Sequence, residues 1–199
     1  MTTEQDYNKL HAPQGETWSD DYQLKHYKTS LKHCKTRRTA IDCGAHIGIF
    51  TRRYAQDFQK VIAIEPITPQ HLAINTQHLG NVQVIPQAVY KDSHTKMYAH
   101  NPGTLTAHTE LQLESIANAQ AIPTVAIDDL DLTDVDIIKI DTQGLEWEVV
   151  VGATNTIKTC KPILHIETRD TLLLDRICEQ FNYKRLDVHI KDWVLGSAE

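Results

Sequence analysis

Residues 39–50, TAIDCGAHIGIF, are the stretch from which the rest of this chain is interpreted. The apolar residues before Gly44 fit a short buried strand, and Gly44 and Gly48 bracket a tight turn from which a helix can start. Such a turn lets the backbone approach a ligand closely and directs helix N-terminal amides toward it. Because glycine turns also serve in packing, the motif alone leaves a binding role and a packing role open.

The length and composition are those of one globular domain, with or without a small appendage. The chain has 199 residues, of which 41% are hydrophobic and 23% charged, and its formal net charge is −6. No apolar run approaches the roughly 18 residues of a transmembrane helix, and the N-terminus lacks the basic-then-apolar layout of a signal peptide. We therefore expect a cytoplasmic protein with no membrane contact and no general attraction to nucleic acid.

The cysteines and histidines contain no recognisable metal motif. The four cysteines are scattered without a CxxC pair, which predicts reduced thiols rather than a zinc site or a disulfide framework. The eleven histidines include no HExxH. His165 and Glu167 form an HxE pair, but the PCxxC partner of a zinc deaminase is missing. The sequence therefore predicts no metal ligands.

Predicted strands and helices alternate along the chain. Apolar residues at three- and four-residue spacing predict an N-terminal helix over 20–35. The expected strands are 40–43, 61–64, 82–85, 124–127, 137–140, 162–166, 183–188 and 191–195. The further helices are expected to run to about 57 and over 69–79, 145–157 and 170–181. The alternation predicts an α/β domain with a doubly wound, mostly parallel sheet.

The remaining segments are less regular. A hairpin is expected around Asp92 and Ser93, whereas 101–121 shows no pattern and is interpreted as a loop that could cover a site. We expect an N-terminal arm and helix over 1–37, followed by the α/β domain over 38–199.

Acidic residues stand at the ends of four predicted strands: Asp42, Glu65, Asp141 and Glu167. In an open α/β sheet the ligand crevice lies at the carboxyl ends of the strands, so we expect these acids to converge there. Buried charges are costly without partners. A ligand with hydroxyls or a positive charge would supply several partners at once.

The spacing of the acids favours one kind of cofactor. Glu65 lies 17 residues after Gly48, close to the place of the ribose-binding acid in nucleotide-binding α/β domains. The alternative for Glu65 is an acid that accepts bonds from neighbouring loop amides. Asp42, just before the first glycine, would repel a pyrophosphate but attract the ammonium of an amino acid. This arrangement, which also departs from GxGxxG, favours S-adenosylmethionine over a dinucleotide.

Five segments carry a resemblance to a known family: IDCGAHIG, the VIAIEP run, QAVYKDS, TVAIDDL and VDIIKIDTQGLEWEVVVGA. In this order, over about residues 38–170, they resemble the FkbM-type S-adenosylmethionine-dependent methyltransferases. The resemblance implies the seven-stranded, Rossmann-like class I methyltransferase fold, with a final antiparallel strand inserted beside the strand at 162–166. It also implies an activity that is typically O-methyl transfer to a hydroxyl of a natural product or sugar. Two positions depart from the family pattern: Gln143 replaces the glutamate of KIDxEG, and His46 stands where asparagine or glycine is common.

The candidate site residues follow from the strand ends and the resemblance. Asp141 is the first candidate for a base that takes the proton of an acceptor hydroxyl, and Glu167 and His165 come next. Lys139 shares a strand face with Asp141 and is expected to pair with a carboxylate. Gln87 is placed near the adenine. The expected cofactor contacts are Asp42, Gly44, Ala45, His46, Gly48, Glu65, Pro66, Gln87 and Asp141.

Other functions stay open at this point. The lysine-rich segment from Lys25 to Arg38 could contact the phosphates of RNA or DNA, although a solvated helix face is the favoured interpretation. An NAD-dependent dehydrogenase is a weaker rival. Gln143 also leaves open a protein that binds the cofactor without catalysis. We expect a small-molecule or carbohydrate acceptor, but no pattern identifies it or the oligomeric state.

Overall fold

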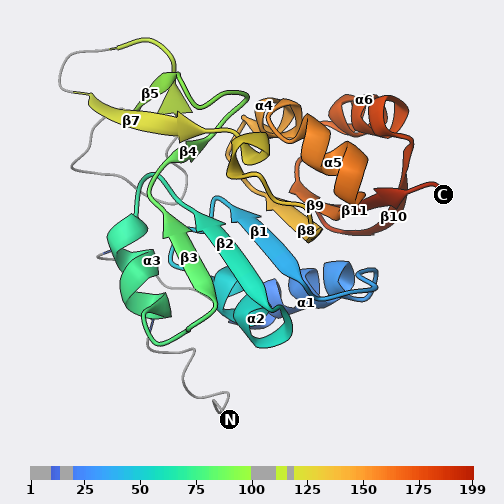
Figure 1. Cartoon of the computed structure of the whole chain (residues 1–199), viewed down its shortest axis with the longest axis horizontal. Helices are drawn as coiled ribbons and strands as arrows, with labels where there is room; N and C mark the ends of the chain where they lie inside the picture. The colour runs from blue at the N-terminus through green and yellow to red at the C-terminus, as the bar shows by residue number, and fades with distance from the viewer. Residues whose placement is uncertain (1–9, 14–19, 100–110, 116–118) are drawn as a thin grey trace.

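The computed structural model describes residues 10–13, 20–99, 111–115 and 119–199, and a seven-stranded sheet forms its centre (Figure 1). The strands are β1 (Thr39–Cys43), β2 (Lys60–Ile64), β3 (Val82–Ile85), β8 (Val135–Ile140), β9 (Ile163–Glu167), β10 (Tyr183–His189) and β11 (Asp192–Ser197). Their order is β10-β11-β9-β8-β1-β2-β3. The pairs from β9 to β3 are parallel, whereas β11 runs antiparallel to both β9 and β10. The predicted mostly parallel sheet, with an antiparallel strand inserted beside β9, is confirmed.

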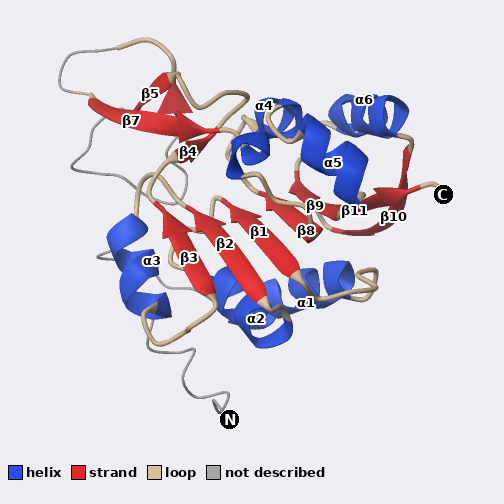
Figure 2. Cartoon of the chain, viewed as in Figure 1, coloured by secondary structure: helices blue, strands red, loops and turns tan. Residues whose placement is uncertain are grey.

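Helices cover both faces of the sheet (Figure 2). One face carries α1 (Asp20–Leu31), α2 (Ile49–Asp57) and α3 (Pro69–Thr76), and the other carries α4 (Glu146–Val151), α5 (Thr154–Cys160) and α6 (Thr171–Phe181). Because successive strand residues point to opposite faces, Ala40 packs with Tyr54 of α2, whereas Ile41 belongs to the cluster that contains Ile157 of α5. Burial on both faces explains why these strands are nearly continuous apolar runs. Among the described residues, no helix has the length and apolar character needed to cross a membrane.

The N-terminal helix packs on the sheet together with α2. Tyr27 and Cys34 are buried in the same cluster as Phe50. α1 ends at Leu31, earlier than the predicted end at 35, and the guanidinium of Arg37 donates a hydrogen bond of 2.8 Å to the Leu31 carbonyl. A basic side chain thus adds a second bond to a carbonyl at the end of the helix, which also accepts one of 3.1 Å from the Cys34 amide. The predicted division of the chain after residue 37 stays a prediction.

The single helix predicted over 145–157 is wrong, because the chain forms α4 and α5 with a break between them. The carboxylate of Asp128 accepts hydrogen bonds from the backbone N–H groups of Asn155 (2.9 Å) and Thr156 (2.8 Å). A distant acid therefore satisfies the unpaired amides of a new helix start. At the break, a Cβ on Gly152 would lie 2.2 Å from the Tyr90 carbonyl oxygen, so only glycine fits this close approach.

Residues between β3 and β8 form a second, four-stranded sheet. Its strands are β4 (Ala88–Val89), β5 (Lys96–Ala99), β6 (Leu111–Gln112) and β7 (Gln120–Val125), in the order β4-β7-β5-β6. The sheet has an apolar cluster of its own, which includes Met97 and Ile122 and contacts Leu145 at the start of α4. Most of the stretch 101–121 lies outside the described residues, and β6 and the start of β7 fall within the rest of it.

The predicted hairpin around Asp92 and Ser93 is wrong. Asp92 does form a turn, since its Oδ1 accepts bonds from the N–H groups of His94 and Thr95. The strands on either side do not pair with each other, because β4 pairs in parallel and β5 antiparallel with β7. The strand predicted over 124–127 is β7, which ends at Val125, and a 3₁₀ turn (Ile127–Leu130) follows it.

We expect Asp136→Asn to destabilise the fold. Asp136 is buried at the start of β8 and accepts bonds from the Thr36 hydroxyl (2.7 Å), the Arg38 amide (2.6 Å) and the Arg38 guanidinium. Burial acts to raise the pKa of Asp136, but the Arg38 and Thr36 bonds outweigh it and hold the pKa below its ordinary value. Loss of the charged acceptor should cost about 1.5–3 kcal/mol at neutral pH, measured by urea unfolding.

The same pKa shift predicts how this loss depends on pH. Because the folded-state pKa is depressed, the stabilisation is fully present above the unfolded pKa of about 3.9 and disappears as the pH falls through the folded value. The wild type and Asp136→Asn should therefore converge in stability below about pH 4. A difference that stayed constant down to pH 3 would contradict the assignment.

Candidate active site

The carboxyl ends of β2, β1, β8 and β9 lie next to one another at one edge of the sheet (Figure 1). Glu65 follows β2, Asp42 lies in β1, Asp141 follows β8, and Glu167 ends β9. The four acids predicted from the sequence therefore stand on four adjacent strands. Their side chains differ in surroundings, however, and this difference decides what each can do.

The glycine turn after β1 is held tightly between the two neighbouring strands. Gly44 and Gly48 have φ values of 76° and 91°, in the region that favours glycine. A Cβ on Gly44 would lie 2.0 Å from the carbonyl oxygen of Asp141. On the other side, the N–H groups of Gly44 and Ala45 donate to the Ile64 carbonyl at 3.0 and 3.1 Å. The turn thus has a packing role in addition to any ligand role.

Glu65, the predicted ribose-binding acid, is 5% exposed and already accepts three backbone hydrogen bonds. Its Oε2 accepts one from His46 (2.8 Å), and its Oε1 accepts two, from Ile67 (2.7 Å) and Thr68 (3.0 Å). Burial raises the pKa of Glu65 against the effect of these bonds. The loop-amide role left open by the sequence is therefore present. A carboxylate has about four acceptor sites, so a ribose contact stays compatible and stays a prediction.

Asp42 faces into the protein, where Lys139 is its ionic partner. The Thr51 hydroxyl donates to Asp42 Oδ2 at 2.6 Å, and the Lys139 ammonium lies 3.6 Å from Asp42 Oδ1 and 3.2 Å from Asp141 Oδ2. The ammonium also lies 4.9 Å from the ring centroid of Phe50. The ion pair predicted for Lys139 is confirmed.

The pKa of Lys139 shows that this buried group stays charged. Burial acts to lower the pKa, but the carboxylates of Asp141 and Asp42 outweigh it and raise the pKa above its ordinary value. Asp42 itself is fully buried, so it presents no surface to a ligand. Its expected contact with a ligand ammonium stays a prediction, and the structure supplies Asp42 with a cation of its own.

A pocket of about 300 Å³ lies beside the ends of β8 and β9. It is lined by Asp141, Gln143, Gly144, Glu146, Glu167, Thr168, Arg169 and Lys191. Gln143 has a φ of 53° and its Nε2 donates a hydrogen bond of 3.1 Å to Asp141 Oδ1. Each oxygen of Asp141 therefore has a donor, Lys139 on one side and Gln143 on the other. A glutamate at 143 could not donate this bond when ionised.

Glu167 forms the other acidic wall of the pocket and pairs with Lys191. Burial and the charge of Asp141 raise the pKa of Glu167, although the Lys191 bond acts against them. A carboxylate with a raised pKa is a stronger base at neutral pH. Of the two predicted acids in the pocket, Asp141 has more donors and Glu167 has this proton-accepting property, so both stay candidates for the base. The third acid of the lining, Glu146, accepts a hydrogen bond of 2.9 Å from the Gly144 amide.

His165 does not reach the pocket, which corrects the expectation that it could take a proton from an acceptor there. It lies two residues before Glu167 on β9 and is 1% exposed. Its ring packs edge-on against that of Phe50, with the ring centroids 5.5 Å apart. Its Nε2 lies 2.9 Å from Oδ1 of Asp192. The side chain therefore belongs to the buried face beneath α1.

The other predicted cofactor contacts lie around the glycine turn and the end of β3. Ala45 is buried against Ala63 and Leu72, and Pro66 follows Glu65 in the half-buried loop. Gln87 donates from its Nε2 to the Thr124 carbonyl at 3.3 Å. Their contacts with a cofactor stay predictions.

Sequence reasoning missed Lys191, Arg169 and Glu146. Lys191 reaches the pocket because β11 runs antiparallel to β9, with Asp192 opposite Glu167.

The basic segment before β1 is partly engaged in the fold: Lys32 pairs with Asp187, and Arg38 with Asp136 at the amino ends of β1 and β8. Arg38 thus lies at the opposite edge of the sheet from the pocket.

Comparison with solved structures identifies the class of fold. Methyltransferase FkbM from Methylobacillus flagellatus KT superposes with a TM-score of 0.55 at 19% identity, over 89% of this chain and 50% of that one. Precorrin-6y C5,15-methyltransferase from Geobacter metallireducens GS-15 gives 0.55 at 13% identity, over 96% and 94%. Ribosomal protein L11 methylase from Lactobacillus delbrueckii subsp. bulgaricus gives 0.57 at 9% identity, over 94% and 82%. At these identities the likeness shows the fold alone, that of Rossmann-like methyltransferases.

The family follows from the sequence match. Residues 42–188 match the family described as Methyltransferase FkbM domain, and the chain belongs to this family. No curated protein matches the chain. The chain spans about half the length of the FkbM structure from M. flagellatus. Membership confirms the resemblance found in the sequence and implies S-adenosylmethionine as the methyl donor.

We expect Gly44→Ala to be far more damaging than Gly144→Ala. Both glycines have positive φ, of 76° and 100°, so both substitutions carry backbone strain of about 1–3 kcal/mol. Only at Gly44 does the new Cβ also collide with backbone, since nothing lies within 4 Å of a Cβ at Gly144. Thermal unfolding should show Gly44→Ala less stable than Gly144→Ala. Equal losses would contradict the close approach of the turn to Asp141.

Proposed function

We propose that this protein binds S-adenosylmethionine beside the glycine turn and transfers the methyl group to a hydroxyl of a sugar or small natural product. The observation that carries the proposal is the pocket at the ends of β8 and β9. Its lining includes the carboxylates of Asp141 and Glu167 in addition to that of Glu146, and it adjoins the turn through the contact between Gly44 and Asp141. A polar lining of this kind suits a hydroxylated acceptor.

The residues at the ends of β1 and β2 fit an adenosyl ligand. Glu65 is an ionisable acceptor fixed by three amides, with acceptor capacity left for a ribose hydroxyl. The turn that holds His46 donates a backbone N–H to Glu65 and packs closely against the backbone of Asp141 at the end of β8. The expected cofactor side therefore adjoins the pocket. When bound, S-adenosylmethionine supplies a methyl carbon activated by its sulfonium.

The chain's own contribution is to position the acceptor and accept its proton. A sugar hydroxyl is about as weak an acid as water, whose pKa is about 15.7, so proton removal assists its attack on the methyl carbon. Asp141 or Glu167 would accept this proton. Lys139 and Gln143 fix the orientation of Asp141, and Lys191 fixes that of Glu167. Orientation of the two reactants can contribute up to about 7–11 kcal/mol to such a displacement.

The cofactor assignment is tested with Glu65→Gln. The glutamine keeps one oxygen for Ile67 and Thr68 but loses the charged acceptor for a ribose hydroxyl, which is worth about 1.5–3 kcal/mol. We expect the Kd for S-adenosylmethionine to rise at least tenfold in calorimetry, while the secondary structure is retained. An unchanged Kd would remove the ribose role and leave Glu65 with its loop amides only.

The acceptor side is tested with Asp141→Asn and Glu167→Gln. Transfer of a labelled methyl group to a panel of sugars and hydroxylated natural products should fall by about 10²–10⁴-fold in the variant that lacks the base. Binding of S-adenosylmethionine should persist in that variant. The exposed Glu179 of α6 provides a matched control, since Glu179→Gln should keep full turnover. Wild-type rates in both pocket variants would reject both carboxylates as base, and transfer to RNA or DNA alone would reject the proposed acceptor class.

A further inference from the structure

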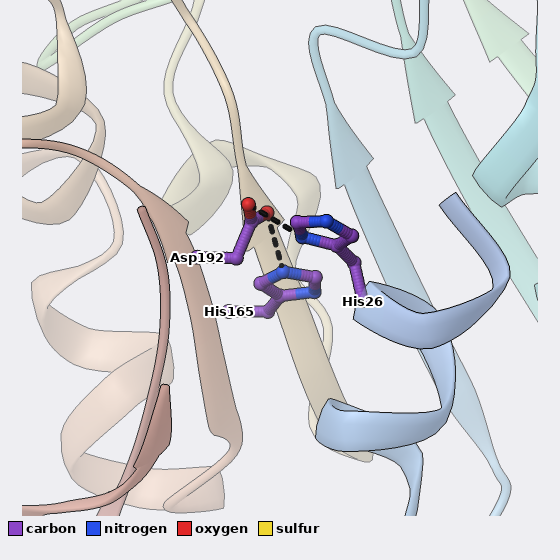
Figure 3. Close-up of side chains that lie close together, drawn as sticks. All are labelled: His26, His165 and Asp192. Atoms are coloured by element: carbon purple, nitrogen blue, oxygen red, sulfur yellow. Dashed lines mark hydrogen bonds and ion pairs between the residues drawn. The ribbon is translucent and has the colours of Figure 1, made fainter. Parts of the chain in front are cut away.

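Three metal-ligating side chains meet outside the pocket, beneath α1 (Figure 3). His26 comes from α1, His165 from β9 and Asp192 from the first position of β11. Their exposed fractions are 2%, 1% and 4%. Three polar side chains from separate parts of the sequence are thus enclosed together, and none of them lines the pocket.

The ligand atoms of this cluster are close enough to share one ion. Nε2 of His165 lies 2.9 Å from Oδ1 of Asp192, and Nδ1 of His26 lies 2.5 Å from Oδ2. One ligand atom from each residue lies within 4.8 Å of the other two. Around a tetrahedral ion with bonds of about 2.0–2.2 Å, ligand atoms lie about 3.3 Å apart, so small side-chain movements would suffice.

Hydrogen bonding alone does not satisfy the cluster. Nδ1 of His165 has no hydrogen-bond partner among the described residues, and Oδ2 of Asp192 has only the ion-pair contact with Nδ1 of His26. Both atoms are fully buried. A buried polar atom without a partner costs about 1–3 kcal/mol of stability, so hydrogen bonding leaves part of the burial cost of this cluster uncompensated.

We propose that His26, His165 and Asp192 bind one divalent transition-metal ion, with zinc as the best match. Two imidazoles and a carboxylate form a set that zinc accepts, with a further position left for water or another ligand. His189, whose ring centroid lies 4.5 Å from that of His26, stands beside the cluster. Magnesium and calcium prefer sites built from oxygen, so they fit this set poorly.

The charge of the cluster is compatible with metal binding. Asp192 turns one carboxylate oxygen toward each imidazole, so an ion bound between the three side chains would meet one carboxylate and two ring nitrogens. Lys139 is the nearby cation, and its own charge is balanced by Asp42 and Asp141. The ion would join α1 to β9 and β11 and is independent of the proposed methyl transfer.

The test starts with wild-type protein treated with a chelator and then titrated with Zn²⁺. We expect one equivalent to bind with a sub-micromolar Kd and to raise Tm by about 5–10 °C when free zinc is 100-fold above Kd. Co²⁺ should give the visible absorption of a low-coordinate site, and Mg²⁺ should leave Tm unchanged. Failure of the wild type to bind one tight equivalent would overturn the proposal without any variant.

Variants then locate the ion. His26→Gln, His165→Gln and the isosteric Asp192→Asn should each raise the zinc Kd by at least about tenfold. The control is His71→Gln, which removes the exposed pair in which His71 Nδ1 lies 2.6 Å from Nδ1 of His11. This control should keep the tight equivalent. Loss of zinc in His71→Gln, or an unchanged Kd in the three cluster variants, would assign the ion elsewhere and overturn the proposal.

Discussion

The ion pairs of the buried Lys139 ammonium are the interactions on which the pocket end of the sheet depends. It stands between Asp42 on β1 and Asp141 after β8, so a single positive charge is shared by two carboxylates on adjacent strands. Without it, the interior would hold uncompensated negative charge, which costs several kcal/mol. The glycine turn packs next to this ion pair, since Gly44 contacts the backbone of Asp141. Asp141 thus links the two features, because its backbone contacts the turn and its side chain pairs with the Lys139 ammonium.

This arrangement makes the site rigid before any ligand arrives. The turn is bonded to the end of β2 through the Ile64 carbonyl and to Glu65 through the His46 amide. Glu65 in turn fixes the loop through Ile67 and Thr68. A preorganised site loses less conformational freedom on binding than a mobile one. Gln143 extends the same principle to the pocket, because its amide donates to the acid that a glutamate in its place would repel.

Local pattern was enough to predict the sheet, because β1, β2, β8 and β9 are short apolar runs ended by an acid or a turn. It also predicted the Lys139 ion pair, since alternation along β8 places Lys139 and Asp141 on one face. The failures arise where distant residues decide: Asp128 starts α5, and β7 separates β4 from β5. His165 points into the protein, away from the pocket, where it contacts Phe50 and Asp192. Lys191 reaches the pocket through the antiparallel register of β11, and His26 reaches Asp192 because α1 packs against the sheet. Local sequence pattern predicts neither placement.

The small sheet of β4 to β7 is inserted between β3 and β8, and its apolar cluster is separate from that of the central sheet. The two sheets meet at Val89 of β4 and Val125 of β7, which belong to the central core cluster, at Leu145 at the start of α4, and where Gly152 approaches Tyr90. Substitutions at insert positions outside these contacts, such as Met97 and Ile122, can therefore accumulate with less effect on the core that carries Asp42, Lys139 and Asp141. Since Leu145 directly follows the pocket residues Gln143 and Gly144, changes in the insert would alter the shape of the pocket before they affected the core. The architecture thus separates a part that can diversify from a part that must be kept.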